Sequence, residues 1–466
     1  MSRQPMPDVV VMLPGITGSV LQKDGKDVWA ISAGTAFRAL VNLGRSLTDL
    51  KLTGDDPEAA DLGDGVRATR VMPDVHLIPG LWKIDGYGKV TQSIKRGFEV
   101  EEGANYFEFP YDWRRDNRAA ARQLAHQSHS WLKAWQERSG NREAKLILVA
   151  HSMGGLVSRF FLECLDGWKV TRMLVTFGTP FGGSLNALGF IANGMRKDLG
   201  PLTLIDLSDL LRSFTSVYQL LPIYDCVDTG GENLLKVTDS GAIPNLDPTR
   251  AEEAMRFHLA IRKAVDAHNQ EDDYRRLRYR IRPIVGMFQP TLQSARVREG
   301  KVELLATYRG RDEGGDGTVP RVSATPLELE KDTGAMYASQ RHASLQNFNA
   351  VLDQLAAVFM EGRIGLDRYY RVNTKLSLEI DDAYGVDEPV EVRVRPEAPG
   401  VDLTAVVVDA DRNTEVIRRD LIVGDDGIYR GIIGHLAPGV YRLTVTGPFA
   451  VDPVTDLFAV FGPPEE

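Results

Sequence analysis

Cysteine is scarce in this chain, since Cys164 and Cys226 are the only two among 466 residues. Cys164 falls in an apolar, helix-like stretch, where a cysteine usually serves as a small buried side chain. One disulfide between the two is open, but nothing in the sequence demands it. So low a count is typical of a protein in a reducing compartment.

Long apolar runs are also lacking. The N-terminal stretch has a single short run at residues 9–13, which is too short for a signal peptide and is better interpreted as a buried strand. Nothing approaches the roughly 20 apolar residues that a membrane span requires. We therefore expect a soluble cytoplasmic protein whose contact with membranes is at most peripheral.

The chain also has no excess of positive charge. The chain has 55 Lys and Arg against 64 Asp and Glu, which gives a net charge of −9, and the two signs are interspersed. This balance argues against nucleic acid as a partner and against strong attraction to anionic membranes, and it leaves neutral or zwitterionic substrates open. With 43% hydrophobic residues there is material for a large core, and the length favours two or three domains.

What the sequence does contain, from residue 8 to about 361, is an alternation of short apolar runs and helix-like stretches. Strands that are apolar throughout and separated by helices indicate a mostly parallel, doubly wound α/β sheet. The predicted strands are 9–13, 106–109, 145–149, 172–176 and 282–286, and the clearest helices are 118–137 and 156–165.

Residues 189–270 interrupt this alternation with an apolar, partly helical insertion that includes SFTSVYQLLP (213–222). Two interpretations stay open. The insertion is either an ordinary packed excursion or a lid over an apolar acyl pocket, because long insertions in such sheets often cover the site.

From about residue 375 the pattern changes to short segments with period-2 alternation, separated by turn signals such as DDAYG and GDDG. Seven such segments without helices predict an antiparallel, immunoglobulin-like β-sandwich over 375–466. The segment 362–374 between the two blocks is the predicted linker, and the first domain is placed at 1–365. The sequence names no ligand or protein partner for the sandwich.

The strongest local signal is LILVAHSMGGL (146–156), in which an apolar strand runs into Ser152 and a helical pattern follows at once. This context is that of a nucleophile elbow, where a tight turn presents the serine hydroxyl at the edge of the sheet. Small residues are required two positions before and after the serine, and Ala150 and Gly154 meet that need. The alternative, a serine that merely caps a helix, is weakened by the residues downstream.

A base and an acid follow in the order that this fold requires. His342 is reached by elimination: His435 belongs to the sandwich, and His258 and His268 precede the best acid. Asp316 is surrounded by three glycines, so its loop can bend to aim the carboxylate at the imidazole. A plain glycine-rich turn is the alternative for Asp316, and Asp312 and Glu313 are its competitors.

An oxyanion hole needs two N–H donors. One is expected from Met153, directly after the nucleophile, and the other from Ile16, in the loop after the first strand. No metal or cofactor is needed for this chemistry.

The chain resembles the lecithin:cholesterol acyltransferase family of α/β-hydrolases, whose motifs it carries in the same order over residues 8–361. The matching segments are LPGITGSVLQKDGKDVW (13–29), FPYDWRRD (109–116), LVAHSMGGLVSR (148–159), VTFGTPFGGS (175–184), SFTSVYQLLP (213–222), GDGTVP (315–320) and RHASL (341–345). The resemblance implies the same triad of Ser152, Asp316 and His342, the same oxyanion donors, and ester-linked acyl lipids as substrates. The β-sandwich lies outside it.

Aromatic side chains occur in two further features of the sequence. In YDWR (111–114) we expect aromatic packing and a buried Arg–Asp pair rather than substrate contact, and Trp29 is a weak candidate for lining the acyl pocket.

The sequence thus predicts a serine-dependent acyl hydrolase or acyltransferase that acts on acyl lipids. A soluble carboxylesterase or amide hydrolase for a small metabolite is the first alternative, and a non-catalytic scaffold is the second.

Overall fold

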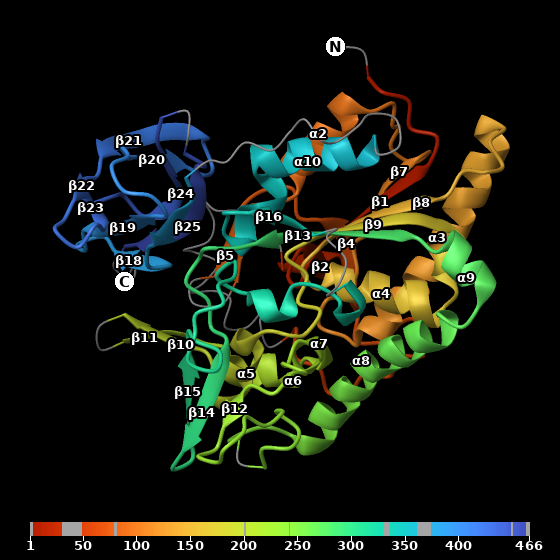
Figure 1. Ribbon diagram of the computed structural model, residues 1–466, viewed down its shortest axis with the longest axis horizontal. Coiled ribbons are helices and arrows are strands. Elements are labelled where there is room, and N and C mark those ends of the chain that lie inside the picture. The colour runs from red at the N-terminus through yellow and green to blue at the C-terminus, as the bar shows by residue number, and fades with distance from the viewer. Residues whose placement is uncertain are drawn as a thin grey trace.

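A computed structural model describes residues 3–29, 49–78, 82–199, 202–241, 243–329, 335–360, 374–448 and 451–462. Within these ranges six strands form a fully parallel central sheet in the order β16-β13-β9-β8-β1-β7 (Figure 1). The strands are β1 (Val9–Leu13), β7 (Tyr106–Glu108), β8 (Leu146–His151), β9 (Thr171–Phe177), β13 (Arg280–Gly286) and β16 (Met336–Ala338). The predicted doubly wound sheet is confirmed, and β16 is a strand that the sequence did not reveal.

Both faces of this sheet are buried, as alternate residues of β1 illustrate. Val9, Val11 and Leu13 pack into one hydrophobic cluster, with α3 (Asn117–Ser139) and α4 (Gly154–Cys164). Val10 and Met12 pack into a second cluster on the opposite face, with α2 (Gly88–Gly97) and α10 (Asn349–Phe359). A strand that is covered on both sides needs apolar residues at every position, which explains the uninterrupted run VVVML.

The segment predicted as an insertion contributes to several elements below the sheet in Figure 1. They are α5 (Leu185–Ala192), the hairpin β10 (Arg196–Leu199) and β11 (Leu202–Asp206), α6 (Ser208–Ser213), α7 (Thr215–Gln219), β12 (Val227–Asp228) and α8 (Pro248–His268). Strand β12 joins β14 (Ser294–Arg298) and β15 (Lys301–Leu305), and α9 (Asp272–Leu277) leads from α8 back to β13. This layer therefore draws on residues up to about 305, beyond the predicted insertion.

Smaller elements precede α2. Strands β2 (Ser19–Lys23), β3 (Lys26–Trp29) and β4 (Val66–Val71) form one antiparallel sheet, and β5 (His76–Ile78) pairs with β6 (Trp82–Ile84).

The C-terminal strands form two sheets in the described part of the chain, with orders β17-β19-β23-β22 and β18-β25-β24-β20-β21. The pairs are antiparallel except for β18 with β25, which run parallel. Their bounds are β17 (Leu376–Glu379), β18 (Ala383–Gly385), β19 (Val390–Pro396), β20 (Thr404–Asp409), β21 (Thr414–Asp420), β22 (Ile422–Val423), β23 (Tyr429–Gly434), β24 (Gly439–Thr446) and β25 (Val454–Phe461). A shared apolar core fills the space between the sheets, as expected for a sandwich.

The predicted linker falls almost wholly on residues 361–373, which lie outside the described residues. Cys164 and Cys226 are both free thiols, so the disulfide that the sequence left possible is not formed. In the ranges given above, no helix is both long and apolar enough to cross a bilayer.

Candidate active site

Ser152 stands on a tight turn between β8 and α4. Its φ of 51° lies in the left-handed region, which a non-glycine residue adopts only where its surroundings enforce it. The Ser152 N–H donates to the carbonyl of Phe177 at 2.8 Å. A Cβ on Gly154 would lie 2.5 Å from the carbonyl oxygen of Pro14, so only glycine fits there. The turn therefore has the geometry of a nucleophile elbow.

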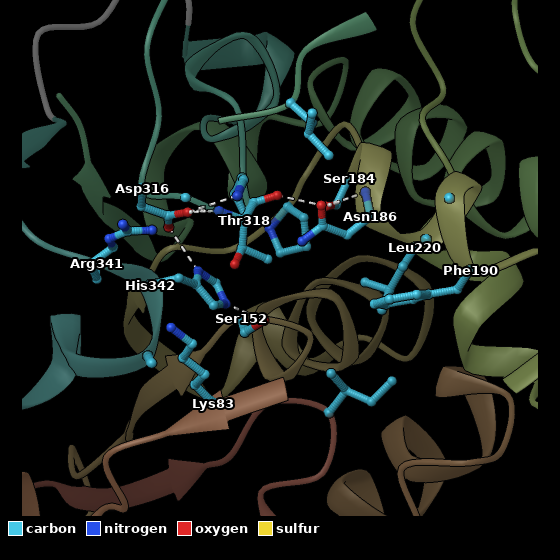
Figure 2. A pocket seen from close by; sticks show the side chains of 18 of the residues that line it. Lys83, Ser152, Ser184, Asn186, Phe190, Leu220, Asp316, Thr318, Arg341 and His342 are labelled. Atoms are coloured by element: carbon cyan, nitrogen blue, oxygen red, sulfur yellow. Dashed lines mark hydrogen bonds and ion pairs between the residues drawn. The ribbon is translucent and has the colours of Figure 1, made fainter. Parts of the chain in front are cut away.

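His342 lies between Ser152 and Asp316 and contacts both (Figure 2). Its Nε2 is 3.0 Å from the Ser152 hydroxyl, and its Nδ1 is 2.7 Å from the nearer Asp316 oxygen. The other Asp316 oxygen accepts the N–H groups of Thr318 at 2.9 Å and Val319 at 2.7 Å. The carboxylate is thus held in place on a buried loop, and it orients the imidazole toward the serine.

Backbone atoms pack closely against the Asp316 and His342 side chains. A Cβ on Gly178, which has a φ of 55°, would lie 2.8 Å from both the Asp316 carboxylate and His342 Nδ1. A Cβ on Gly286, at the end of β13, would lie 2.4 Å from the Asp316 Cβ. The glycines of FGTP and of the β13 end therefore make the room that the acid and the base occupy.

The two N–H groups expected to form an oxyanion hole flank the serine. Met153 is the first residue after it and caps α4, and Ile16 lies in the loop that follows β1. In the described part of the chain neither N–H has a protein acceptor. A Cβ on Gly15 would lie 2.8 Å from the Ser152 Cβ, so this loop runs directly past the nucleophile. Both donors are thus available beside Ser152.

A buried pair that the sequence analysis missed connects these parts. The Tyr87 hydroxyl accepts the Gly15 N–H at 2.8 Å and lies 2.9 Å from His151 Nδ1. His151 Nε2 lies 3.2 Å from the carbonyl of His342. Because that carbonyl can only accept, His151 carries its proton on Nε2, and Tyr87 donates to Nδ1. The only sequence signal was the position of His151 next to the serine.

Burial, together with the nearby His342, lowers the pKa of His151 well below its ordinary value. Burial also raises the pKa of Tyr87. Both groups therefore stay neutral around neutral pH, and the network positions the Gly15 loop and the His342 backbone without adding charge.

A pocket of about 390 Å³ opens at Ser152 and His342 and has two unlike ends. Phe190 and Leu220 lie at one end. The lining also includes the apolar Ala187, Val217, Leu292 and Leu304, from α5, α7 and the segment that includes β15, and the amides of Asn186 and Asn193 at α5. The other end is lined by Lys83, Arg341, Asp382 and Asp456. Figure 2 shows Phe190 and Leu220 on one side of Ser152, and Lys83 and Arg341 on the other. The site is thus open to a molecule that is apolar at one end and polar at the other.

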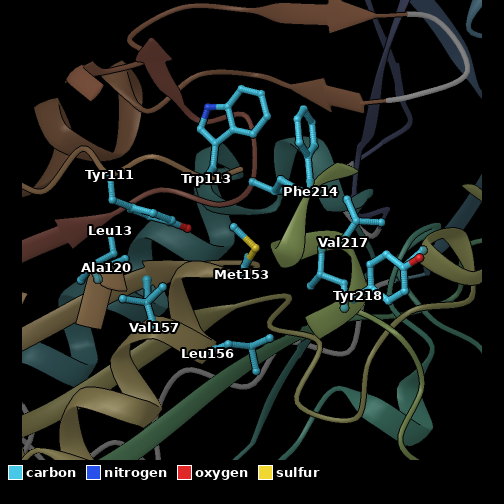
Figure 3. Close-up of a cluster of buried hydrophobic side chains, with 14 of the residues drawn as sticks. Leu13, Tyr111, Trp113, Ala120, Met153, Leu156, Val157, Phe214, Val217 and Tyr218 are labelled. Atoms are coloured by element: carbon cyan, nitrogen blue, oxygen red, sulfur yellow. The ribbon is translucent and has the colours of Figure 1, made fainter. Parts of the chain in front are cut away.

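Trp29 belongs to the core instead. Its ring packs edge-on against Trp113 with centroids 5.0 Å apart, and its Nε1 donates to the Thr17 carbonyl at 3.1 Å. It is not among the described residues that line the pocket. Trp113 in turn packs on Phe214, within the cluster that also holds Met153 (Figure 3).

The YDWR segment has the packing role expected of it. The Tyr111 hydroxyl donates to the Pro14 carbonyl at 2.9 Å, and Arg114 is fully buried in ion pairs with Asp112 and Asp64. The Tyr111 contact supports the loop that carries Ile16.

Comparisons with known proteins find similarity over part of this chain. The model of the lecithin:cholesterol acyltransferase family matches residues 81–297. The chain is 28% identical over 149 residues to the lysosomal phospholipase A and acyltransferase of Homo sapiens, which covers 31% of this chain and 35% of that protein. It is 26% identical over 235 residues to lecithin-cholesterol acyltransferase-like 4 of Arabidopsis thaliana, which covers 46% of this chain and 42% of that protein. The chain spans less than half the length of either relative.

Among solved structures, a chain in the crystal structure of the Tle4-Tli4 complex aligns with 77% of this chain and 98% of its own length, at 15% identity and a TM-score of 0.49. The family match confirms the resemblance over residues 81–297, which contain the motifs at 109–116, 148–159, 175–184 and 213–222. The matched range contains Ser152 and the residues of α5 and α7, whereas Asp316, His342 and the sandwich lie beyond it.

Proposed function

From this similarity to the lecithin:cholesterol acyltransferase family, we propose that the protein is a serine-dependent acyl hydrolase or acyltransferase for ester-linked acyl lipids. The observation that carries the proposal is the unbroken chain Ser152–His342–Asp316, with contacts of 3.0 and 2.7 Å, at the mouth of a pocket with one apolar end. These distances are within the range required for a nucleophile, its base and the group that orients the base.

In the proposed mechanism His342 Nε2 takes the Ser152 proton as the hydroxyl attacks the ester carbonyl. The resulting oxyanion accepts hydrogen bonds from the N–H groups of Ile16 and Met153. The intermediate then collapses, the bond to the alcohol breaks, and His342 gives its proton to the leaving oxygen. Water or a second alcohol, deprotonated by His342, releases the acyl group from Ser152.

The apolar end of the pocket supports a lipid acyl chain. Phe190, Val217 and Leu220 belong to the segment predicted as a cap, 189–270, so this segment lines the side of the site where an acyl chain would lie. An apolar chain gains roughly 0.8 kcal/mol for each buried methylene, which favours long-chain esters over short ones.

Labelling with a fluorophosphonate probe tests the nucleophile. We expect modification of wild type at Ser152 only, located by mass spectrometry of the peptides, and no modification of Ser152→Ala. A folded wild type that stays unlabelled would contradict the proposal and leave the scaffold alternative.

A series of 4-nitrophenyl esters tests the acyl pocket. We expect kcat/KM to rise from two-carbon to long acyl groups in wild type. Leu304→Trp should fill the apolar end and lower the preference for long chains about tenfold, while two-carbon esters react as before. If two-carbon esters were the better substrates of wild type by a hundredfold, the small-metabolite esterase would be the correct function.

A further inference from the structure

The C-terminal β-sandwich reaches the catalytic pocket itself. Asp382, next to β18, and Asp456, on β25, both line the cavity that contains Ser152 and His342. They pair with cations of the catalytic domain: Lys83 lies 2.5 Å from Asp382 and 3.0 Å from Asp456, and Arg341 lies 3.3 Å from Asp456. One wall of the site is therefore built jointly by both parts of the chain.

The same contact holds the segment that leads to His342. Gln340 accepts the Thr455 N–H at 2.9 Å, the Ser339 hydroxyl donates to the Leu376 carbonyl at 3.1 Å, and Arg341 donates to the Leu378 carbonyl. The three residues before the base are thus tied one after another to strands or strand ends of the sandwich. Such successive anchoring fixes the wall relative to the catalytic imidazole.

The position of this wall determines which part of an ester it meets. His342 Nε2 must give its proton to the leaving oxygen, so the alcohol part of the substrate lies on the His342 side. Lys83 and Arg341 lie on that side of Ser152 in Figure 2, and the apolar residues Phe190 and Leu220 lie on the other. The acyl chain and the alcohol therefore face walls of opposite character.

The accessible charges of the wall are those of Asp382, Arg341 and Lys83. The side chains of Asp382, Arg341 and Lys83 are 30%, 16% and 15% exposed, whereas that of Asp456 is 2% exposed and serves as the buried counterion. Lys83 and Asp382 pair directly with each other, and Arg341 belongs to the segment that leads to His342. The two cations and two carboxylates balance, so removal of the charge of Lys83 or of Asp382 leaves the wall with a net charge of one sign.

We propose that the β-sandwich forms the alcohol-binding wall of the active site, where Lys83 and Asp382 select the alcohol part of the ester by its charge. This inference rests on the proposed acyl-transfer function, and it gives the sandwich a part in substrate choice. A neutral wall tolerates alcohols of either charge, and each charge removed should favour one of them.

The test uses full-length protein and three esters of the same decanoyl chain: decanoylcholine with a cationic alcohol, monodecanoylglycerol with a neutral one, and decanoyl glycerol phosphate with an anionic one. Asp382→Asn should raise the ratio of kcat/KM for the anionic over the cationic ester about tenfold, and Lys83→Gln should lower it by a similar factor. Asp426→Asn, which removes an exposed carboxylate paired with Arg430 elsewhere on the sandwich, is the matched control and should leave the ratio unchanged.

Because the ratio is internal to each variant, partial loss of folded protein cancels. An unchanged ratio in both variants would overturn the inference. If kcat/KM also fell equally on all three esters, the wall would have a structural role only. Fluorophosphonate labelling of wild type at Ser152 separates this failure from that of the proposed function, which would show as an unlabelled and inactive wild type.

Discussion

At the scale of single residues, several polar groups of this protein are buried without charge. His151 is enclosed between Tyr87 and the His342 backbone, and His258 is a buried residue of α8 with its Nε2 2.8 Å from the Gln219 carbonyl. Burial lowers the pKa of His258 to about 4. A buried histidine that stays neutral in the folded protein lowers stability at pH values where the same side chain is protonated in the unfolded chain. At higher pH the side chain is neutral in both states, and this loss disappears.

His258 gives a pH prediction with a definite sign. The unfolded chain takes up a proton on this side chain near pH 6.5, and the folded protein does so only near pH 4, so stability is lost as pH falls between these values. The loss for this residue amounts to about 3 kcal/mol. We expect the difference in unfolding free energy between wild type and His258→Gln, measured in urea, to shrink from pH 7 to pH 4. His129→Gln on the exposed side of α3 is the matched control. A difference that stays constant over this range would contradict the prediction.

At the scale of elements, the sequence predicted the strands whose residues are apolar without interruption and the turn that carries Ser152. The sequence signals of these strands and of this turn are local. A run of apolar residues marks a strand that is buried on both faces, and a glycine two residues after the serine marks the turn, so a few neighbouring positions are enough to recognise each. Strand β16 was missed because its three residues, MYA, give no period of their own. Leu292 and Leu304 were missed as pocket residues because only the fold brings them next to α5.

The contact of α4 with the loop after β9 gives an element-scale prediction. A Cβ on Gly155 would lie 2.1 Å from the Thr179 Oγ1, and Thr179 is itself held by its hydrogen bond to the Ser152 carbonyl at 2.9 Å. Gly155→Ala should therefore separate the helix from this loop and lower the free energy of unfolding by about 1–3 kcal/mol. Chemical denaturation measures the change.

Gly97→Ala, at the end of α2, is the control, since no described atom lies within 4 Å of the added methyl group. A Gly155→Ala variant as stable as this control would show that the helix can shift without cost.

At the scale of the whole molecule, the sequence predicted a sandwich beside an α/β domain but not that the two share a site. Its composition names no ligand, and the contacts that join it to the pocket connect residues far apart in the chain, such as Lys83 and Asp456. Such pairs leave no periodic pattern in either segment. The Ser152–His342–Asp316 geometry, by contrast, was expected from motif order alone, and the catalytic role of these residues stays a prediction that the labelling experiment tests.

Gln289 is where this coupling between the two parts can be measured. Its backbone N–H donates to the Gly315 carbonyl at 2.9 Å, next to Asp316, and its side-chain amide pairs with β17, donating to the Leu376 carbonyl at 2.8 Å and accepting the Leu378 N–H at 3.1 Å. Gln289→Ala would leave the buried Leu378 N–H unpaired, which costs about 1–3 kcal/mol, and the Leu376 carbonyl would keep only the Ser339 hydroxyl as a side-chain partner. We expect faster hydrogen exchange, followed by mass spectrometry, in peptides covering 374–380 and also 339–345, because Ser339 and Arg341 bind the same strand.

The matched control is Gln92→Ala, which removes an exposed amide from α2. Faster exchange in 374–380 alone would mean that the segment before His342 keeps its position without β17. Faster exchange in both segments would mean that the sandwich stabilises the part of the chain that presents the base. A mutation on the far side of the interface could then slow acyl transfer without touching Ser152, His342 or Asp316.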